Sequence, residues 1–132
     1  MCLSGLESDK PLIADVDIIC YKMLKVQPVF KIFGYDFGTQ YLSPFHRMKY
    51  KIGKTYKSDL VVDTDCFDCR YYVVEDGLHT FADKDEAKNH VHDGEVLVKC
   101  MIPKGSKYFS GHFGISQSLA SEKLTVIKIL DN

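Results

Sequence analysis

The sequence predicts an α+β fold made mainly of antiparallel strands, about six or seven in number, with one short central helix. Two segments, 95–102 and 123–130, are rich in β-branched residues and have the length of buried strands. The one convincing helical pattern covers residues 83–90, where acidic residues occupy the first turn and Lys88 and His90 come late. Because strands precede and follow this helix without alternating with further helices, antiparallel pairing is expected.

The first third of the chain contains three further candidate strands. Residues 15–26 are rich in β-branched and aromatic side chains, which favour a strand. Residues 29–33 form a second short apolar run, and the two glycines in 34–38 predict a turn after it. Residues 40–45 are expected to be extended, because a proline disfavours helical conformation in the residue before it.

The middle of the chain adds three short strands. Residues 49–57 alternate between a largely apolar set and a set dominated by lysine, which predicts one outer strand exposed on one side. Residues 70–74 form another apolar run. Gly77 predicts a turn, followed by the short apolar segment 78–81 and then the helix, which Thr80 or Asp83 can cap.

The composition is that of a single globular domain covering residues 1–132, with residues 1–13 as a candidate flexible N-terminal arm. The formal net charge of −1 gives no bulk electrostatic case for nucleic acid or an anionic membrane. No long apolar run predicts a membrane helix, and no signal-peptide pattern opens the sequence. Together with five cysteines, an odd number, these features predict a cytoplasmic protein with free thiols.

Cys66 and Cys69 have the spacing of a metal-binding or redox pair. A structural zinc site needs four ligands, and the sequence contains no second pair of this kind. A redox motif would need a helix directly after it, whereas 70–74 is a predicted strand. We therefore expect no bound metal, with these two cysteines as the weak candidates.

Lysine and aromatic residues provide the candidate recognition surface. The densest basic stretch lies in residues 46–57, where lysines alternate with tyrosines, as in surfaces that bind nucleic acid or nucleotide phosphates. The alternative is the solvated face of an edge strand. His79 could act as a base or ligand, but capping or exposure to solvent is the alternative. The candidate binding residues are Tyr21, Tyr41, Arg47, Lys49, Tyr50, Lys54 and His79.

Several segments together carry a resemblance. They are Ile18-Ile-Cys-Tyr-Lys-Met-Leu24, Tyr41-Leu-Ser-Pro-Phe45, Gly77-Leu-His-Thr-Phe81, Val98-Lys-Cys-Met-Ile-Pro-Lys-Gly-Ser-Lys-Tyr108 and Ala120-Ser-Glu-Lys-Leu124, with the stretch from Tyr50 to Tyr56. With these segments the chain resembles a group of small hypothetical proteins from bacteriophages and gut bacteria. The resemblance implies a phage-related or mobile-element context and no particular activity.

A more distant likeness concerns ADP-ribosyltransferase-like minimal domains. Tyr21-Lys22, Gly77-Leu-His-Thr-Phe81 and Glu122 can be placed on the plan of that family. The likeness implies an NAD cofactor in a cleft, with Lys22, Ser43 and Glu122 as catalytic candidates. The sequence departs from the family in having lysine where arginine or histidine is usual.

We therefore expect a binding module without catalysis, because no catalytic constellation stands out and aromatic and basic residues are abundant. Its partner is expected to be a host protein or a small nucleotide-type ligand, with no cofactor, and its context a phage accessory or counter-defence role. The alternative is an NAD-dependent ADP-ribosyltransferase-like enzyme.

Overall fold

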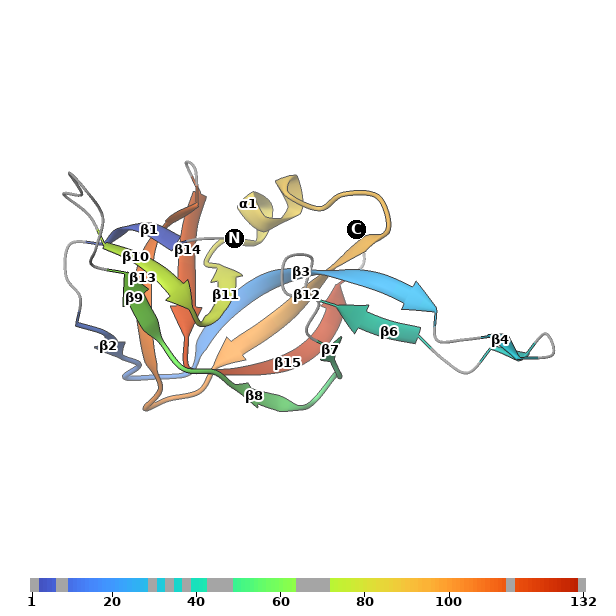
Figure 1. The fold of residues 1–132 in the computed structure, drawn as a ribbon, viewed down its shortest axis with the longest axis horizontal. Coiled ribbons are helices and arrows are strands. Elements are labelled where there is room, and N and C mark those ends of the chain that lie inside the picture. Colours follow the sequence, from blue (N-terminus) through green and yellow to red (C-terminus); the bar gives the residue numbers. More distant parts are fainter. Residues whose placement is uncertain are drawn as a thin grey trace.

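A computed structural model describes residues 3–6, 10–28, 31–32, 35–36, 39–42, 49–63, 72–113 and 116–130. These residues form mostly antiparallel sheet, with a single short helix among them, as Figure 1 shows. The prediction of an α+β fold with about six or seven strands is therefore wrong. Within the described ranges, no helix combines the length and apolar character needed to cross a membrane.

The elements follow one another as β1 Leu3–Leu6, β2 Leu12–Ile13, β3 Ile18–Pro28, β4 Lys31–Ile32, β5 Tyr35–Asp36, β6 Thr39–Leu42, β7 Lys49–Tyr50, β8 Thr55–Lys57, β9 Val61–Asp63, β10 Tyr72–Asp76, β11 Leu78–Phe81, α1 Lys84–Asn89, β12 Glu95–Ile102, β13 Lys107–Phe113, β14 Ser116–Ser121 and β15 Lys123–Leu130. Strands β12 and β15 have the boundaries that the sequence predicts. Strands β1 and β2 lie in the segment expected as an N-terminal arm, and they pair with β13, β1 also with β10.

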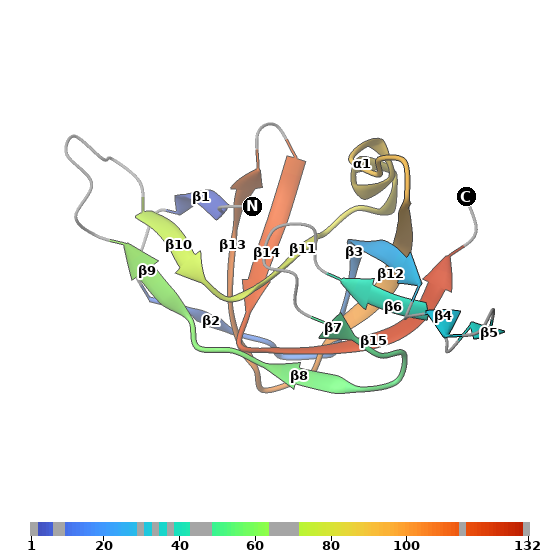
Figure 2. The same cartoon turned by 45° about the vertical axis from the view of Figure 1, so that its right-hand side comes forward.

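The main sheet runs in the order β8-β15-β12-β3-β11-β14-β13-β1-β10-β9. Its first and last strands, β8 and β9, are consecutive in the chain and separated by residues 58–60. One continuous segment therefore pairs with β15 at one end of the sheet and with β10 at the other. Figure 2 shows this segment in green between the two ends, so the sheet closes on itself through residues 55–63.

Strand β3 shows how the sheet divides into two faces, because successive side chains of a strand point to opposite sides. Cys20 and Leu24 lie in a core on the face we call inner, with Val98, Leu119 and Leu124 among their neighbours. On the opposite face, which we call outer, a smaller core contains Met23, Phe81 and Leu97 of the sheet and Ala87 of the helix.

Helix α1 begins where the sequence predicts it. The carboxylate of Asp83 accepts hydrogen bonds from the backbone N–H groups of Asp85 at 2.7 Å and Glu86 at 3.1 Å. Just after the helix, the ring of His90 stacks on that of Phe81, with centroids 4.8 Å apart. These contacts hold the helix on the part of the outer face formed by β3, β11 and β14.

The prediction of one continuous strand over residues 49–57 is wrong. The chain turns between β7 and β8, and Gly53 has a φ of 85°, a left-handed conformation that glycine adopts without a steric cost. The N–H of Gly53 donates to the carbonyl of Val126 at 2.6 Å, which fixes the turn against β15. The turn separates the two tyrosines of this segment along the chain, yet the rings of Tyr50 and Tyr56 still meet edge to face at 4.8 Å.

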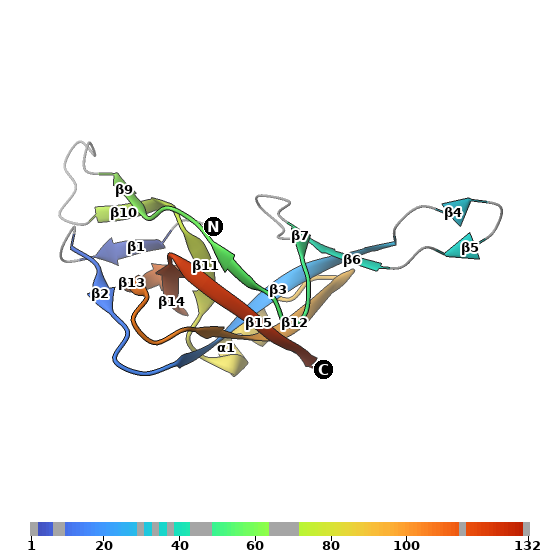
Figure 3. The same cartoon turned by 90° about the horizontal axis from the view of Figure 1, so that it is seen from below.

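Strands β3 and β6 form a ribbon that continues beyond the main body of the sheet. Val26 pairs with Tyr41, and Pro28 with Thr39. The two-stranded sheet of β4 and β5 lies at the tip of this ribbon, farthest from the rest of the protein (Figure 3). Strand β3 extends to Pro28, two residues beyond the segment 15–26 that the sequence predicts.

Candidate functional site

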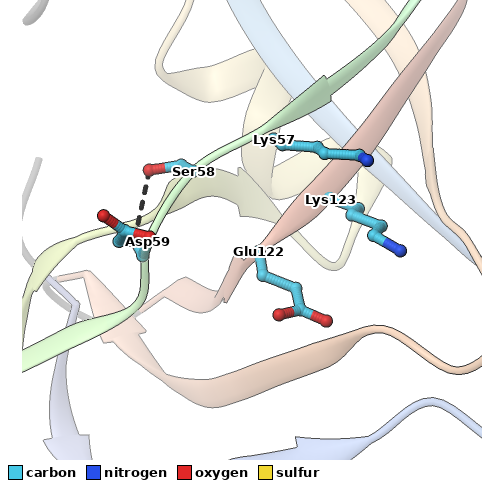
Figure 4. A pocket seen from close by; sticks show the side chains of 5 residues that line it. All are labelled: Lys57, Ser58, Asp59, Glu122 and Lys123. Atoms are coloured by element: carbon cyan, nitrogen blue, oxygen red, sulfur yellow. Dashed lines mark hydrogen bonds between the residues drawn. The ribbon is translucent and has the colours of Figure 1, made fainter.

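A polar pocket of about 390 Å³ lies where the closing segment passes β15. We call it the lysine pocket. Its lining residues, shown in Figure 4, are Lys57, Ser58, Asp59, Glu122 and Lys123. The two lysine side chains extend in the same direction, with the carboxylate of Glu122 beside them, whereas Asp59 lies at the other end of the group.

The register of β8 and β15 places the two lysines side by side. Lys57 is directly opposite Lys123, and two positions further along the pair Thr55 is opposite Thr125, so all four side chains share one face. The hydroxyl groups of these threonines are 2.7 Å apart and share a hydrogen bond. The N–H of Ser58 donates to the carbonyl of Glu122 at 2.8 Å, which fixes the chain where it leaves β8.

The corner between β14 and β15 positions the acidic residue of the pocket. One carboxylate oxygen of Glu122 accepts a hydrogen bond from the N–H of Lys107 at 3.1 Å, and its own N–H donates to the carbonyl of Lys107 at 3.0 Å. The carboxylate is thus engaged by the backbone of β13. Neither Lys57 nor Lys123 forms an ion pair with a carboxylate of the described residues.

Two like charges directly opposite each other in a strand pair destabilise the fold. A bound anion between Lys57 and Lys123 would remove this repulsion, whereas the hydroxyl of Ser58 already donates to the carbonyl of Asp59 at 3.1 Å. The pocket therefore has the chemistry of a phosphate site. The sequence marks Lys57 only as part of the basic stretch 46–57 and does not mark Ser58 or Lys123, because the proximity of these residues depends on a strand register that spacing along the chain does not reveal.

Lys22 is the most unusual charged residue of the inner face. Its side chain is only 8% exposed, and its ammonium donates a hydrogen bond to the carbonyl of His79 at 2.7 Å. The same ammonium lies 5.6 Å from the centre of the Tyr50 ring. Burial lowers the pKa of Lys22 from 10.5 to about 8, because the charged form loses hydration there.

Two buried cysteines lie beside Lys22. Cys20 and Cys100 are directly opposite each other on β3 and β12, both as free thiols. Burial raises the pKa of Cys20 to about 11 and that of Cys100 further, so both thiols are protonated at neutral pH. Within the described ranges, no three histidine, cysteine or acidic residues come together as a metal site.

The structure brings some of the predicted binding residues together. Tyr41 is directly opposite Tyr50, and Lys49 is opposite Leu42. Lys54 lies over the ring of Tyr56 at 5.4 Å from its centre. The tyrosines therefore belong to the packing around Lys22, and Lys49 and Lys54 remain exposed around it.

The structure excludes both structural roles expected for His79, which were capping of the helix and exposure to solvent. Its side chain is 4% exposed, so it neither faces solvent nor caps the helix, whose cap is Asp83. It lies in the centre of β11, opposite Ala120 of β14. Ser43, Arg47, Cys66 and Cys69 lie outside the described residues.

The residues named for the NAD-binding cleft are separated in the described structure. Tyr21 and Lys22 are neighbours in β3 and point to opposite faces, since Tyr21 packs beside the outer core. Glu122 lines the lysine pocket, and Lys22 is not among the residues that line it. Among the described residues, the lysines that line the pocket with Glu122 are Lys57 and Lys123.

Comparisons with protein-family models, curated proteins and solved structures found no match to this chain. The function is therefore inferred from the geometry and charge of the described residues. Among these, the lysine pocket combines an open volume with two cations that the strand register places side by side.

Proposed function

We propose that this protein is a binding module without catalysis that holds a small nucleotide-type ligand by its phosphate in the lysine pocket. The observation that carries the proposal is the direct opposition of Lys57 and Lys123 across β8 and β15 at the rim of a polar cavity. Repulsion between the two lysines lowers the stability of the free protein, and a phosphate bound between them would remove this repulsion.

Titration calorimetry with ADP, pyrophosphate and adenosine tests this proposal. Pyrophosphate and ADP are expected to bind and adenosine is not, because the lysines recognise phosphate. Replacing both Lys57 and Lys123 by glutamine should weaken ADP binding by about tenfold or more, a loss of about 1.4 kcal/mol.

The matched control replaces Lys84 and Lys88 of the helix by glutamine, which changes the net charge equally at exposed positions away from the pocket. The control should bind ADP like the unmodified protein. Equal loss in both double variants would mean that the chain's overall charge, and not the pocket, attracts the nucleotide.

In the phage-related context that the sequence resemblance implies, such a module would act by sequestering a signalling nucleotide. A host protein is the other partner class in the same proposal, and binding would then depend on side chains outside the pocket. Recovery of intact ligand after incubation is expected in either case, and recovery of altered ligand would contradict a binding module.

One observation favours a second candidate, the NAD-dependent enzyme. Glu122 is an acid in the same pocket as two cations that could hold a pyrophosphate. Incubation with NAD should then release nicotinamide, and Glu122→Gln should abolish the release while NAD still binds. Intact NAD after prolonged incubation would exclude this candidate.

A further inference from the structure

We infer that the outer face of β8, β15 and β12 binds an extended single-stranded nucleic acid along a stripe of four lysines. We call this set the lysine stripe: Lys57, Lys99, Lys123 and Lys128. The inference rests on the proposed function, because the lysine pocket forms one end of the stripe. It goes further in naming a chain of phosphates as the ligand.

The stripe consists of two lysine pairs of the same kind. Lys57 is opposite Lys123, and Lys99 of β12 is opposite Lys128 of β15. Both pairs place like charges directly across a strand junction, which costs stability and has no structural benefit. A repeated arrangement of this kind along one strand indicates an anion that extends beyond a single phosphate.

An irregularity in β15 brings the two pairs onto the same face. Cys100 pairs with Val126 and Lys99 with Lys128, so Ile127 is an extra residue on β15. Lys123 and Lys128 are five positions apart, and in a regular strand they would point to opposite faces. The bulge reverses the alternation and turns Lys128 to the side of Lys123.

The stripe has little local acid to neutralise it. Lys57 and Lys128 are exposed, Lys99 and Lys123 are half-buried, and none of the four forms an ion pair with a carboxylate of the described residues. Glu122 lies at the pocket end, already bound to the N–H of Lys107. At the other end of β12, Glu95 is opposite Lys25. A net charge of −1 for the whole chain therefore hides a locally basic face.

Apolar and aromatic side chains lie next to the charges on this face. Met101 is opposite both Thr125 and Ile19, and Ile19 is 40% exposed. Tyr21 is opposite Lys99 and half-buried. Unpaired bases stack or pack on such surfaces, while their phosphates follow the cations. A duplex would keep its bases stacked on one another, so the single strand fits this face better.

The stripe is too long for a single nucleotide to contact both lysine pairs. Because Ile127 is an extra residue, Lys123 and Lys128 are separated by four regular strand steps, which is about 13 Å at about 3.3 Å per residue. The phosphates of one nucleoside diphosphate are adjacent to each other and can occupy only one lysine pair. Several consecutive nucleotides are needed to reach both.

Fluorescence anisotropy with a labelled single-stranded dT12 oligonucleotide tests the inference in three double variants. Glutamine replaces Lys99 and Lys128 in the first, Lys57 and Lys123 in the second, and Lys84 and Lys88 of α1 in the third. The first two should each weaken dT12 binding by about fivefold or more. The slope of log K against the logarithm of the salt concentration should become shallower by about 1.4, as expected for the loss of two phosphate contacts to a single strand. The third should bind dT12 normally.

The binding of ADP, measured on the same variants, separates the inference from the proposed function. Of the four lysines of the stripe, only Lys57 and Lys123 should affect the affinity for ADP. If the Lys99 and Lys128 variant binds dT12 normally while ADP still requires the pocket pair, the stripe is overturned and the proposed function stands. If dT12 needs both pairs but ADP does not bind, the small-ligand proposal fails and the stripe stands. Equal affinity for a poly-glutamate peptide would overturn the assignment to nucleic acid.

Discussion

At the scale of single residues, Lys22 combines burial with a charge that has no carboxylate beside it among the described residues. Its contacts are the carbonyl of His79, the ring of Tyr50 and the thiols of Cys20 and Cys100. The sequence drew attention to this lysine through a family likeness. Its burial could not be predicted, because alternation in β3 is consistent with either face until the neighbouring strands are known.

Replacing Lys22 by methionine should stabilise the protein at pH 7 by about 1–3 kcal/mol, because a side chain of similar length removes the buried charge. The pKa of Lys22 is about 8 in the folded protein and 10.5 ordinarily, so between these values the unfolded chain binds more protons. Stability due to Lys22 therefore rises with pH, and the advantage of the methionine variant should shrink by about 1 kcal/mol per pH unit between pH 8 and 10.5.

Urea unfolding of both proteins across this pH range measures the difference directly. Comparing the two is necessary because Cys20, Cys100 and Tyr50 have raised pKa values, which lower stability as pH rises above about 9. These groups are present in both proteins and cancel to first order. Parallel stability curves would show that Lys22 is already neutral or well hydrated in the folded state.

At the scale of elements, the helix and the two strongest strands could be predicted because their signals are local. Capping acids mark α1, and runs of β-branched residues mark β12 and β15. Strands β13 and β14 were not predicted, because serine, glycine and histidine interrupt their apolar residues. Ser118 and Ser121 are nonetheless fully buried, so these strands form through pairing with their neighbours rather than through intrinsic preference.

Removal of the helix cap tests how strongly this local signal contributes. Asp83→Ala should lower the free energy of unfolding by about 1 kcal/mol, because two N–H groups lose their acceptor. Asp83→Asn should retain most of the stability, since its side-chain oxygen can still accept. Thermal unfolding of the two variants measures the difference, and equal losses would point to the charge and not the hydrogen bonds.

At the scale of the whole molecule, the closed path of the sheet could not be predicted from sequence. It depends on β8 and β9, short strands of three residues each, whose pairings lie at opposite ends of the strand order. The lysine pocket shares this origin, because Lys57 and Ser58 belong to the closing segment and Glu122 and Lys123 to β15 and its corner. Nothing in the spacing of these residues along the chain reveals that they meet.

Ser58→Pro tests the closure, because it removes the N–H that donates to Glu122 at 2.8 Å. The expected loss is about 1–3 kcal/mol, with faster hydrogen exchange in both β15 and β10 although these strands are far apart in the sheet. Ser58→Ala is the control, because the side-chain hydroxyl bonds only the adjacent Asp59 carbonyl among the described residues. Faster exchange confined to β15 would show that the two ends are independent.

The closing segment also sets how the chain must fold. Its two halves have their final partners only when β10, from the middle of the chain, and β15, from its C-terminal part, have both reached the sheet. Strand β3 likewise pairs along its length with β12, so Ile18 pairs with Ile102, which is distant from it in the chain. Few of these contacts are local, and proteins dominated by distant pairings fold in milliseconds to seconds rather than microseconds. The lysine pocket therefore forms only once residues 57–59 and 122–123, which are distant in the chain, have come together.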